Sequence, residues 1–454
     1  MNYGLRNRIF HGLAAKGFGQ IITALIQVVS VPLFIHYWGI ELYGEWLVLC
    51  TIPAYFAMSD VGFASVAAND MTMLVAKGER RTALEVFQST WVFVSVTSFL
   101  VIIIFVPMVW IIPFDKWLQL RSLTDFETAA VVSFLILHVL LGLQGGFLHA
   151  GFRCEGRYAR GILWSNLMRL AEFTAVTIGV CLGATPSVVA LLFLGTRIGG
   201  SFMFWLDLHR CSPWIVFGHR LATRASIKRL AFPALTFMGF PAGNAISLQG
   251  MVMVVAAMLG PTSVVVFSTV RTLTRLGLQA MEMINSTVWP EISVAYGADD
   301  ISLARKLHRH SCQASFWLCL SLVASLWFFG EWIIAIWTHG QVTPDGNLMR
   351  LLLAVIFANS LWYTSSVVMV AVNRHQQMAL VYLIGTGLSL LLARAFIPVF
   401  GLDGAALGLL VIDVVMSVYV VRNSLKLLND RLGDFLQSVL VPPFYLLYMR
   451  RVSR

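Results

Sequence analysis

Long apolar runs separated by short polar clusters dominate this sequence. A helix that crosses a bilayer needs about 20 mainly apolar residues, and twelve such runs can be read along the chain. They lack the period-two alternation of barrel strands, so closed helices are the way to satisfy their backbones in lipid. The pattern predicts an all-α membrane protein with about twelve spans, near residues 12–36, 42–70, 86–112, 127–150, 161–182, 188–208, 229–257, 262–296, 311–337, 348–371, 378–399 and 405–428.

The composition agrees with this pattern. Of 454 residues, 58% are apolar and 12% are charged, and the mean hydropathy is +0.79. A soluble protein carries about 25% charged residues, so this chain cannot cover a surface that faces water. These values exclude a soluble enzyme, a disordered chain and a nucleic-acid-binding protein, despite the net charge of +10.

The basic residues instead indicate topology. With the N-terminus placed in the cytoplasm, two of the 32 Lys and Arg residues (Lys116 and Arg121) lie in outside loops and six lie within spans, which leaves 24 on the inside. Such an asymmetry is typical of the positive-inside rule. The sequence therefore predicts a multi-pass protein with both termini in the cytoplasm.

A basic connection near the middle predicts two lobes. Residues 209–228 form the longest inside connection and divide the spans six and six. Trp38-Gly39 followed by Gly78-Glu79 in the first half is echoed by Leu259-Gly260 and Gly297-Ala298-Asp299 in the second. We predict a first lobe over 1–208, a linker over 209–228, a second lobe over 229–430 and a cytoplasmic tail over 431–454 with a short interfacial segment.

The most informative charges lie in the predicted span 262–296. Arg271, Arg275, Gln279, Glu282 and Asn285 follow a helical period and form one polar stripe. Two arginines one turn apart repel each other, and a single Glu282 cannot neutralise both. Because guanidinium grips phosphate oxygens in pairs, this face suits an anion. The alternative is that the arginines pair with acids on neighbouring helices or snorkel.

Other polar residues extend the candidate site. In span 12–36, Lys16, Gln20 and Gln27 share one face, and we interpret them as lining a cavity, with an interfacial anchor as the alternative for Lys16. Arg197 lies between Gly195 and Gly199, which would permit close helix approach and let the arginine point into the same cavity.

Acidic residues within the spans leave two roles open. Asp60 is a proton site or the partner of a cavity arginine, and Glu282 is a second cavity charge. Glu172 lies three residues after Arg169, a spacing that favours an internal ion pair between them.

The sequence contains no grouping that indicates catalysis. The ten histidines and six cysteines form no metal-ligand spacing, and there is no Ser/His/Asp arrangement and no Gly-rich phosphate loop. We therefore predict no catalytic residue, no metal and no cofactor. A membrane-embedded transferase would need acid and base groups gathered on one face, and the pattern disfavours it.

Several motifs resemble a known family. Val31-Pro32, the stretch Trp38–Trp46 (WGIELYGEW), Ser59–Phe63 and Asn69 resemble the opening of polysaccharide-export flippases, and Arg271 to Pro290–Ser293 resembles their second lobe. Their superfamily also holds multidrug and toxin extruders and murein-precursor flippases. This chain lacks the two further C-terminal helices of the murein-precursor branch. It also lacks the first-helix acid of cation-coupled extruders, where Gln27 is the nearest polar residue before Pro32.

The resemblance implies a V of two six-helix lobes in a bacterial inner membrane, working by alternating access around a cationic cavity. It implies a flippase for an undecaprenyl-pyrophosphate-linked oligosaccharide, with surface (O-antigen type) polysaccharide polymerase and chain-length proteins as partners and no nucleic acid. Arg271 and Arg275, with Arg197 and Lys16, would hold the pyrophosphate, and Gln20, Gln27 and Gln279 would line the site. Export of each negative charge gains about 2.3 kcal/mol per 100 mV. The alternative is a multidrug or metabolite exporter of the same superfamily, for which acids in the lumen would be expected.

Overall fold

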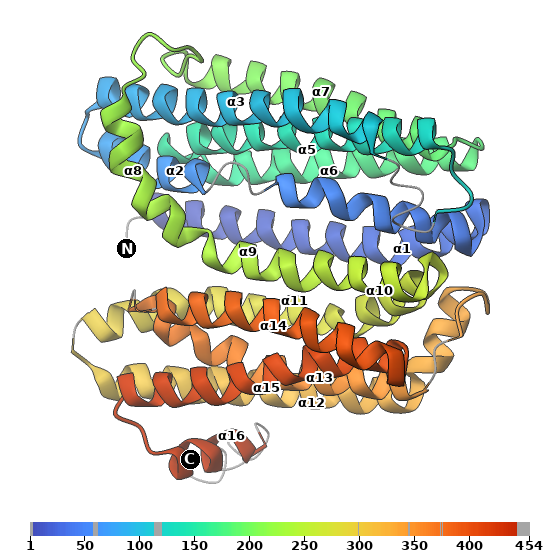
Figure 1. The fold of residues 1–454 in the computed structure, drawn as a ribbon. Helices are drawn as coiled ribbons and strands as arrows, with labels where there is room; N and C mark the ends of the chain where they lie inside the picture. The colour runs from blue at the N-terminus through green and yellow to red at the C-terminus, as the bar shows by residue number, and fades with distance from the viewer. Residues whose placement is uncertain are drawn as a thin grey trace. The chain divides into compact units, whose positions relative to one another are not determined.

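The computed structural model describes residues 3–57, 62–112, 120–297, 299–343, 346–372, 374 and 376–442. The described residues form helices and connections without strands, which confirms the all-α prediction (Figure 1). The elements are α1 (Tyr3–Phe56), α2 (Phe63–Ala76), α3 (Arg80–Ile111), α5 (Asp125–Cys154), α6 (Tyr158–Cys181), α7 (Pro186–Cys211), α8 (Arg224–Phe237), α9 (Gly239–Ala245), a π-helical turn (Ile246–Gly250), α10 (Met251–Leu259), α11 (Pro261–Gly297), α12 (Ile301–Trp337), α13 (Gly346–Ala371), α14 (Gln376–Phe400), α15 (Leu402–Leu427) and α16 (Leu432–Leu440). Ten of the twelve predicted spans each coincide mainly with one helix or one part of a helix. The predicted span 42–70 is divided between α1 and α2, with residues 58–61 outside the described part, and 229–257 is divided among α8, α9, the π-helical turn and α10.

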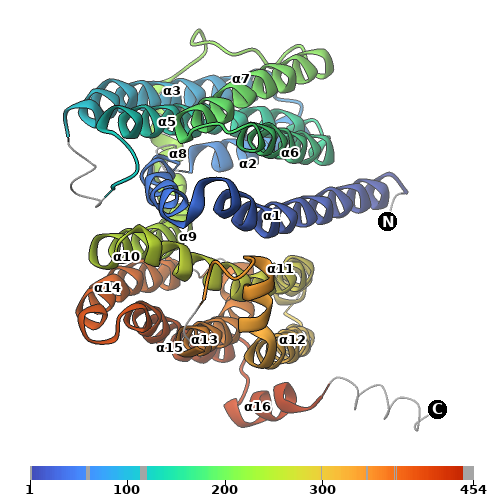
Figure 2. The ribbon, with the colours of Figure 1, turned by 90° about the vertical axis from the view of Figure 1, so that its right-hand side faces the viewer.

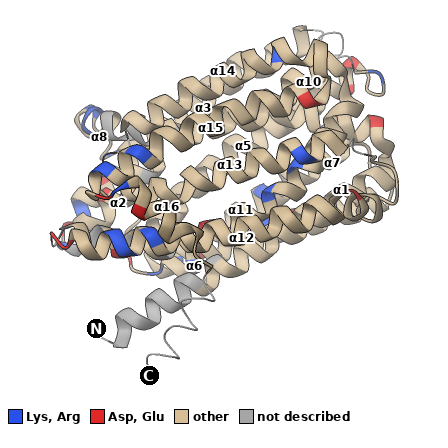
Figure 3. Ribbon diagram, turned by 90° about the horizontal axis from the view of Figure 1, so that it is seen from below, with Lys and Arg blue, Asp and Glu red and all other residues tan. Residues whose placement is uncertain are grey.

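Within this described part, nine helical stretches are long and apolar enough to cross a membrane by length and composition. The charged residues of α6 and α11 lower the hydropathy of two further long helices. Figure 3 shows that most of the helix lengths carry no charge, and that Lys and Arg gather near α2 and α8 and beside α16. These features describe a multi-pass membrane protein.

The chain divides into two compact units, each with its own packing. The first holds residues Met1–Ala245 and Gly260–Thr262, and the second holds Ile246–Leu259 and Ser263–Arg454. In the first unit, α5 packs against α1, α2, α3, α6 and α7. In the second, α15 packs along both α13 and α14, and α12 lies against α13.

Helix α1 contains the break that the motif Trp38-Gly39 predicts. Its 54 residues would extend roughly 80 Å, far more than one crossing of a bilayer. At Gly39 the backbone leaves helical geometry with φ of 76°, a conformation that glycine adopts without strain. The Trp38 indole N–H donates to the Ala184 carbonyl at 3.0 Å, so the turn between the first two spans is held to α7's entry loop.

Glu45, in the same motif, has a structural role. It is buried at 1% exposure, and its Oε1 accepts from the backbone N–H groups of Arg121 and Ser122 at 2.6 and 2.8 Å. By accepting these two hydrogen bonds, the carboxylate satisfies backbone N–H groups of the loop that would be costly to bury without a partner. Trp38 and Glu45 of the motif Trp38–Trp46 thus hold two loops against α1.

The connection 209–228 is tied to α3. The Gln88 side-chain amide donates to the Val216 carbonyl at 3.0 Å and accepts from the Leu221 N–H at 2.9 Å. The Ser89 hydroxyl accepts from the Thr223 N–H at 2.9 Å. This basic segment therefore lies along one end of the first unit.

Helix α15 approaches α14 through two small residues four apart. A Cβ on Gly404 would lie 2.5 Å from the backbone carbon of Phe396, and one on Gly408 would lie 2.7 Å from the Ser389 carbonyl oxygen. Helices that associate in membranes use this spacing to bring backbones together. The GxxxG motif therefore sets the distance between α14 and α15.

Helix α16 corresponds to the start of the predicted interfacial tail. It lies against α12 (Figures 1 and 2), with Phe435 and Val439 buried and Leu432, Leu436 and Leu440 exposed. The rest of the predicted apolar run, from 443 onward, lies outside the described residues.

We predict that Gly408→Ala destabilises the second unit. The added methyl would meet backbone atoms of α14, which cannot move independently of that helix. We expect a loss of about 1–3 kcal/mol, measured as a lower midpoint of thermal unfolding in detergent. Gly387→Ala is the matched control, because nothing lies within 4 Å of the new Cβ on α14, and helix propensity alone favours alanine. Equal midpoints for the two variants would contradict this packing.

Candidate functional site

A cavity of about 470 Å³ lies inside the first unit. Its walls come from α2, α5, α6 and α7, and small side chains keep it open. On α5, nothing lies within 4 Å of a Cβ built on Gly145, and on Gly142 such a Cβ would meet the Arg197 guanidinium at 3.8 Å and no other atom within 4 Å. Ala64 and Ala68 of α2 continue this wall. The volume falls within the range of small-molecule sites.

Basic and apolar side chains line this cavity together. The basic ones are Arg153, Arg169, Arg197 and His149, and the larger apolar or aromatic ones are Met168, Tyr158 and Phe204. The lining found among described residues includes no carboxylate. The cavity is therefore suited to an amphipathic molecule with negative charge.

Two of the arginines have neutral partners. Arg153 Nη2 donates to Asn69 Oδ1 at 2.7 Å, and Arg169 Nη1 donates to the Thr23 hydroxyl at 2.6 Å. Both side chains are exposed. An amide oxygen or a hydroxyl orients a guanidinium without neutralising it, so both charges remain available to an anion.

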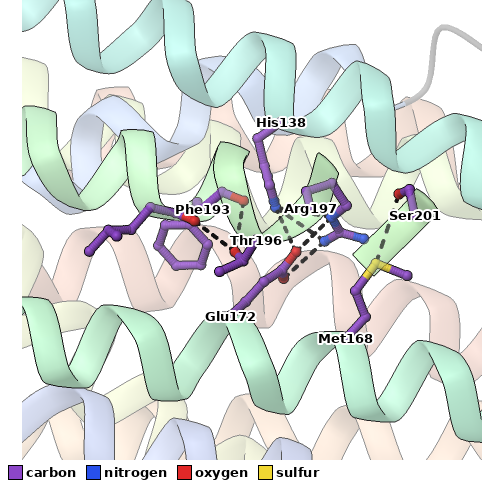
Figure 4. A network of polar contacts seen from close by, with 8 residues as sticks. His138, Met168, Glu172, Phe193, Thr196, Arg197 and Ser201 are labelled. Carbon is purple, nitrogen blue, oxygen red and sulfur yellow. Dashed lines mark hydrogen bonds and ion pairs between the residues drawn. The ribbon is translucent and has the colours of Figure 1, made fainter. Parts of the chain in front are cut away.

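The third arginine belongs to an ion-pair network (Figure 4). Arg197 Nε lies 2.7 Å from Glu172 Oε1, and its Nη2 donates to Oε2 at 3.0 Å. His138 Nε2 lies 3.2 Å from Glu172 Oε1 and 3.1 Å from Arg197 Nη2. Glu172 is 4% exposed, so the pair satisfies charges that would be costly alone.

The network places one histidine nitrogen between an acceptor and a donor. Nε2 of His138 can donate to the carboxylate when it carries a proton and can accept from the guanidinium when it does not. The network is therefore satisfied in either tautomer, and the arginine stays fixed at the cavity wall.

These contacts correct two sequence-based expectations. Arg169 does not pair with Glu172, because Arg197 of α7 takes that carboxylate. Gly195 and Gly199 do not mediate close approach, since nothing lies within 4 Å of a Cβ built on either. Arg197 lines the cavity of the first unit with its charge compensated by Glu172, and no residue of α11 lines that cavity among the described residues.

In the second unit, Arg271 is held by neutral groups. Its Nη1 donates to the Leu248 carbonyl at 3.1 Å, and the guanidinium lies over the Phe267 ring at 5.0 Å. Leu248 lies in the π-helical turn Ile246–Gly250, and π-helical turns occur frequently at functional sites. The anchor is thus a backbone oxygen and an aromatic face, and among the described residues Arg271 forms no ion pair with an acid.

Arg275 lies among polar groups of neighbouring helices. It interacts electrostatically with Asp413, Tyr363 and Tyr382. Asp413 Oδ1 accepts from the Asn359 amide at 2.8 Å and from the Trp362 indole N–H at 2.9 Å. Among described residues, no hydrogen bond from the Arg275 guanidinium is found, whereas the Arg271 guanidinium donates one to a backbone carbonyl. The sequence pattern gave no role to Asp413.

The remaining predicted residues are placed as follows. Glu282 accepts a hydrogen bond from the Tyr363 hydroxyl and is exposed. Gln279, Gln20 and Gln27 are half-buried on α11 and α1. The Lys16 side chain and Asp60 lie outside what the structure describes. The polar stripe of α11 therefore contains residues with different partners and different exposure.

We predict that Glu172 and Arg197 are energetically coupled. Arg197→Gln would leave the buried Glu172 carboxylate without its arginine, at a cost of about 3–5 kcal/mol. Glu172→Gln should cost less, because the Arg197 side chain is 24% exposed at the cavity wall. The double variant should lose less than the sum, with a coupling of about 1–3 kcal/mol in a double-mutant cycle of thermal unfolding. Arg169→Gln, an exposed arginine bonded to a hydroxyl, serves as the control and should change stability by no more than about 0.5 kcal/mol. Additive losses would refute the pairing.

No protein-family model matches this sequence, and no curated relative is found. Solved structures do match the fold. An inward-facing multidrug resistance MATE family transporter of the MOP superfamily has a TM-score of 0.70 and 13% identity over 93% of this chain and 94% of that one. An outward-facing MATE transporter of the MOP superfamily gives 0.60 and 15% over 91% and 96%.

A third match is a MOP superfamily transporter from Pyrococcus furiosus, whose binding pocket of reverse polarity is described as suggesting a different function. Its TM-score is 0.59, with 13% identity over 93% of this chain and 94% of that chain. None of these three is described as carrying a polysaccharide. The chain has the helical fold shared by these MATE and MOP superfamily transporters.

Proposed function

We propose that this protein is an alternating-access exporter of small amphipathic molecules that carry negative charge. The observation that carries the proposal is the cavity of the first unit, which combines three arginines with apolar side chains and open space of about 470 Å³. The shared fold supports transport in general, since the matching structures are described as transporters. The chemistry of the cavity supports an anionic cargo in particular.

Arg153 and Arg169 would supply the binding charge. Their neutral partners, Asn69 and Thr23, orient them without cancelling their charge. Arg197 would shape the wall, because Glu172 neutralises it. An anionic group entering the cavity would meet two uncompensated guanidiniums, while Met168 and Phe204 would contact its apolar part.

The membrane potential would favour this direction of transport. Moving one negative charge from the negative inside to the positive outside gains about 2.3 kcal/mol per 100 mV. A cationic molecule would gain nothing outward from the same field and would be repelled by the arginines. The positive charge of the cavity and the inside-negative membrane potential therefore both favour an anionic cargo.

Filling the cavity should stop transport. Gly145→Phe would place a ring in open space at the cavity wall, and we expect efflux of 8-anilinonaphthalene-1-sulfonate from proteoliposomes to fall at least tenfold. Gly195→Phe is matched in size and has no atoms near its Cβ, but it does not line the cavity and should retain efflux. The cation ethidium should not be exported by the wild type. The proposal would be overturned if the wild type exported ethidium and Gly145→Phe exported 8-anilinonaphthalene-1-sulfonate as fast as the wild type does.

A second candidate is the flipping of a lipid-linked oligosaccharide across the bacterial inner membrane. Arg275 supports it, since that charge lacks a hydrogen-bond partner among described residues and lies in the segment that resembles polysaccharide-export flippases. In this scheme Arg271 and Arg275 would bind the pyrophosphate, and the polyprenyl chain would stay in lipid. Surface polysaccharide polymerases would then consume the flipped product.

The arginines of α11 separate the two candidates. In liposomes that contain a fluorescent polyprenyl-pyrophosphate-linked sugar, Arg275→Ala should abolish flipping and Arg275→Lys should retain part of it, because lysine keeps the charge without the paired donors. Arg271→Ala should also lower flipping, and its unfolding midpoint must be measured in parallel because the Leu248 contact is lost. Flipping that is unchanged in both alanine variants, or absent in the wild type, would exclude this second function.

A further inference from the structure

A second cavity, in the second unit, lies between α16 and the transmembrane helices. Its volume is about 600 Å³, and it is bordered by α12, α13, α15 and α16. Along α15 it extends from Ser417 to Lys426, which is roughly 14 Å of helix. The groove therefore runs from within the apolar part of α15 to the end of that helix.

The walls of this groove are apolar. Phe316 and Val418 face it from the transmembrane helices, and Leu432, Leu436 and Leu440 face it from α16. The three leucines are exposed, so α16 presents an apolar side that the protein itself leaves uncovered. A helix of this type lies at the membrane interface.

Specific contacts hold α16 in place. The Phe435 ring stacks on His308 with centroids 5.2 Å apart. Just beyond α16, the Val441 carbonyl accepts from the Gln313 amide at 2.6 Å and from the Trp317 indole N–H at 3.1 Å. The groove is thus bounded by a docked helix, and its shape does not depend on an occupant.

Two cations line the groove near the C-terminal end of α15. Arg422 and Lys426 are one helical turn apart on α15, and both are exposed. In the described part of the chain neither forms an ion pair. The neighbouring acid, Asp430, is occupied, since Arg309 Nε donates to its Oδ2 at 2.9 Å and Nη2 donates to its Oδ1. The charges of Arg422 and Lys426 remain available.

We propose that this groove binds an anionic phospholipid. An acyl chain would lie between α15 and α16, and the phosphate would contact Arg422 and Lys426. Basic pockets at the ends of membrane helices bind anionic head groups in this way, and guanidinium suits phosphate oxygens. An apolar metabolite would not use the two cations. A zwitterionic lipid carries the same phosphate, but its ammonium group offsets that charge and weakens the attraction to both cations. This site is separate from the cargo cavity, so it does not depend on the proposed transport function.

The test measures lipid binding to the delipidated full-length protein by native mass spectrometry, with phosphatidylglycerol and phosphatidylethanolamine as probes. The wild type should prefer phosphatidylglycerol. Arg422→Gln with Lys426→Gln should weaken phosphatidylglycerol binding about 25-fold, at roughly fivefold per charge, and should weaken phosphatidylethanolamine binding much less, because the ammonium group of that lipid offsets its phosphate charge. Arg220→Gln with Arg224→Gln removes two exposed arginines at the same spacing elsewhere and should have no such effect.

A steric variant tests the apolar part independently. Val418→Trp should fill the groove and lower binding of phosphatidylglycerol with both cations present. Val415→Trp, at an exposed α15 position that does not line the groove, should leave binding unchanged. Equal binding of the two lipids by the wild type, or equal effects of the two double-glutamine variants, would overturn the proposal. Lipid binding that appears only after deletion of residues 443–454 would also overturn it, because the tail would then be the occupant.

Discussion

The structure depends on one constraint: a polar group inside a low-dielectric bundle needs a partner, because no water is present to replace it. The contacts of the charged residues follow from it. Arg197 is bound by Glu172 in the first unit, Asp413 accepts two N–H groups in the second, and Arg271 donates to the Leu248 carbonyl in the π-helical turn. A charge without such a partner is then informative, because the fold tolerates it only where water or a ligand can reach it.

The cavity of the first unit follows from the same constraint combined with helix packing. Where glycines meet another backbone, as at Gly404 and Gly408, they bring helices together. At Gly142 and Gly145 the same residue type has the opposite effect, because no backbone lies within 4 Å of the position that a Cβ would take, and only the Arg197 side chain reaches it at Gly142. The open space lies beside Arg153 and Arg169, whose partners are neutral. In the first unit, the open space that packing leaves and the uncompensated positive charge therefore lie side by side.

The sequence predicted the helices well because each apolar run exceeds the length of a bilayer crossing, and the break at Gly39 is marked by its residue type. It failed for contacts between helices. Glu172 is three residues from Arg169, but its partner is 25 residues away on α7, and no local spacing encodes that pairing. Arg153, which the charge pattern assigned to an inside loop, lies in the last turn of α5 and lines the cavity. Arg271 and Arg275 are one helical turn apart, yet Arg271 donates to the Leu248 carbonyl and Arg275 lies near Asp413, and the helical spacing encodes neither contact.

The balance of charge within each unit bears on which one would bind an anion. In the first unit, three cavity arginines accompany one carboxylate, Glu172, which leaves an excess of two positive charges. In the second, Arg271 and Arg275 share their surroundings with Asp413 and Glu282, so the formal charges cancel. Coulomb attraction for an anion depends on this local sum and on the low dielectric around it. An isolated arginine stripe in a sequence is therefore weaker support for anion binding than it first suggests, because acids from distant helices can cancel it, whereas the first unit keeps its excess after its helices have packed.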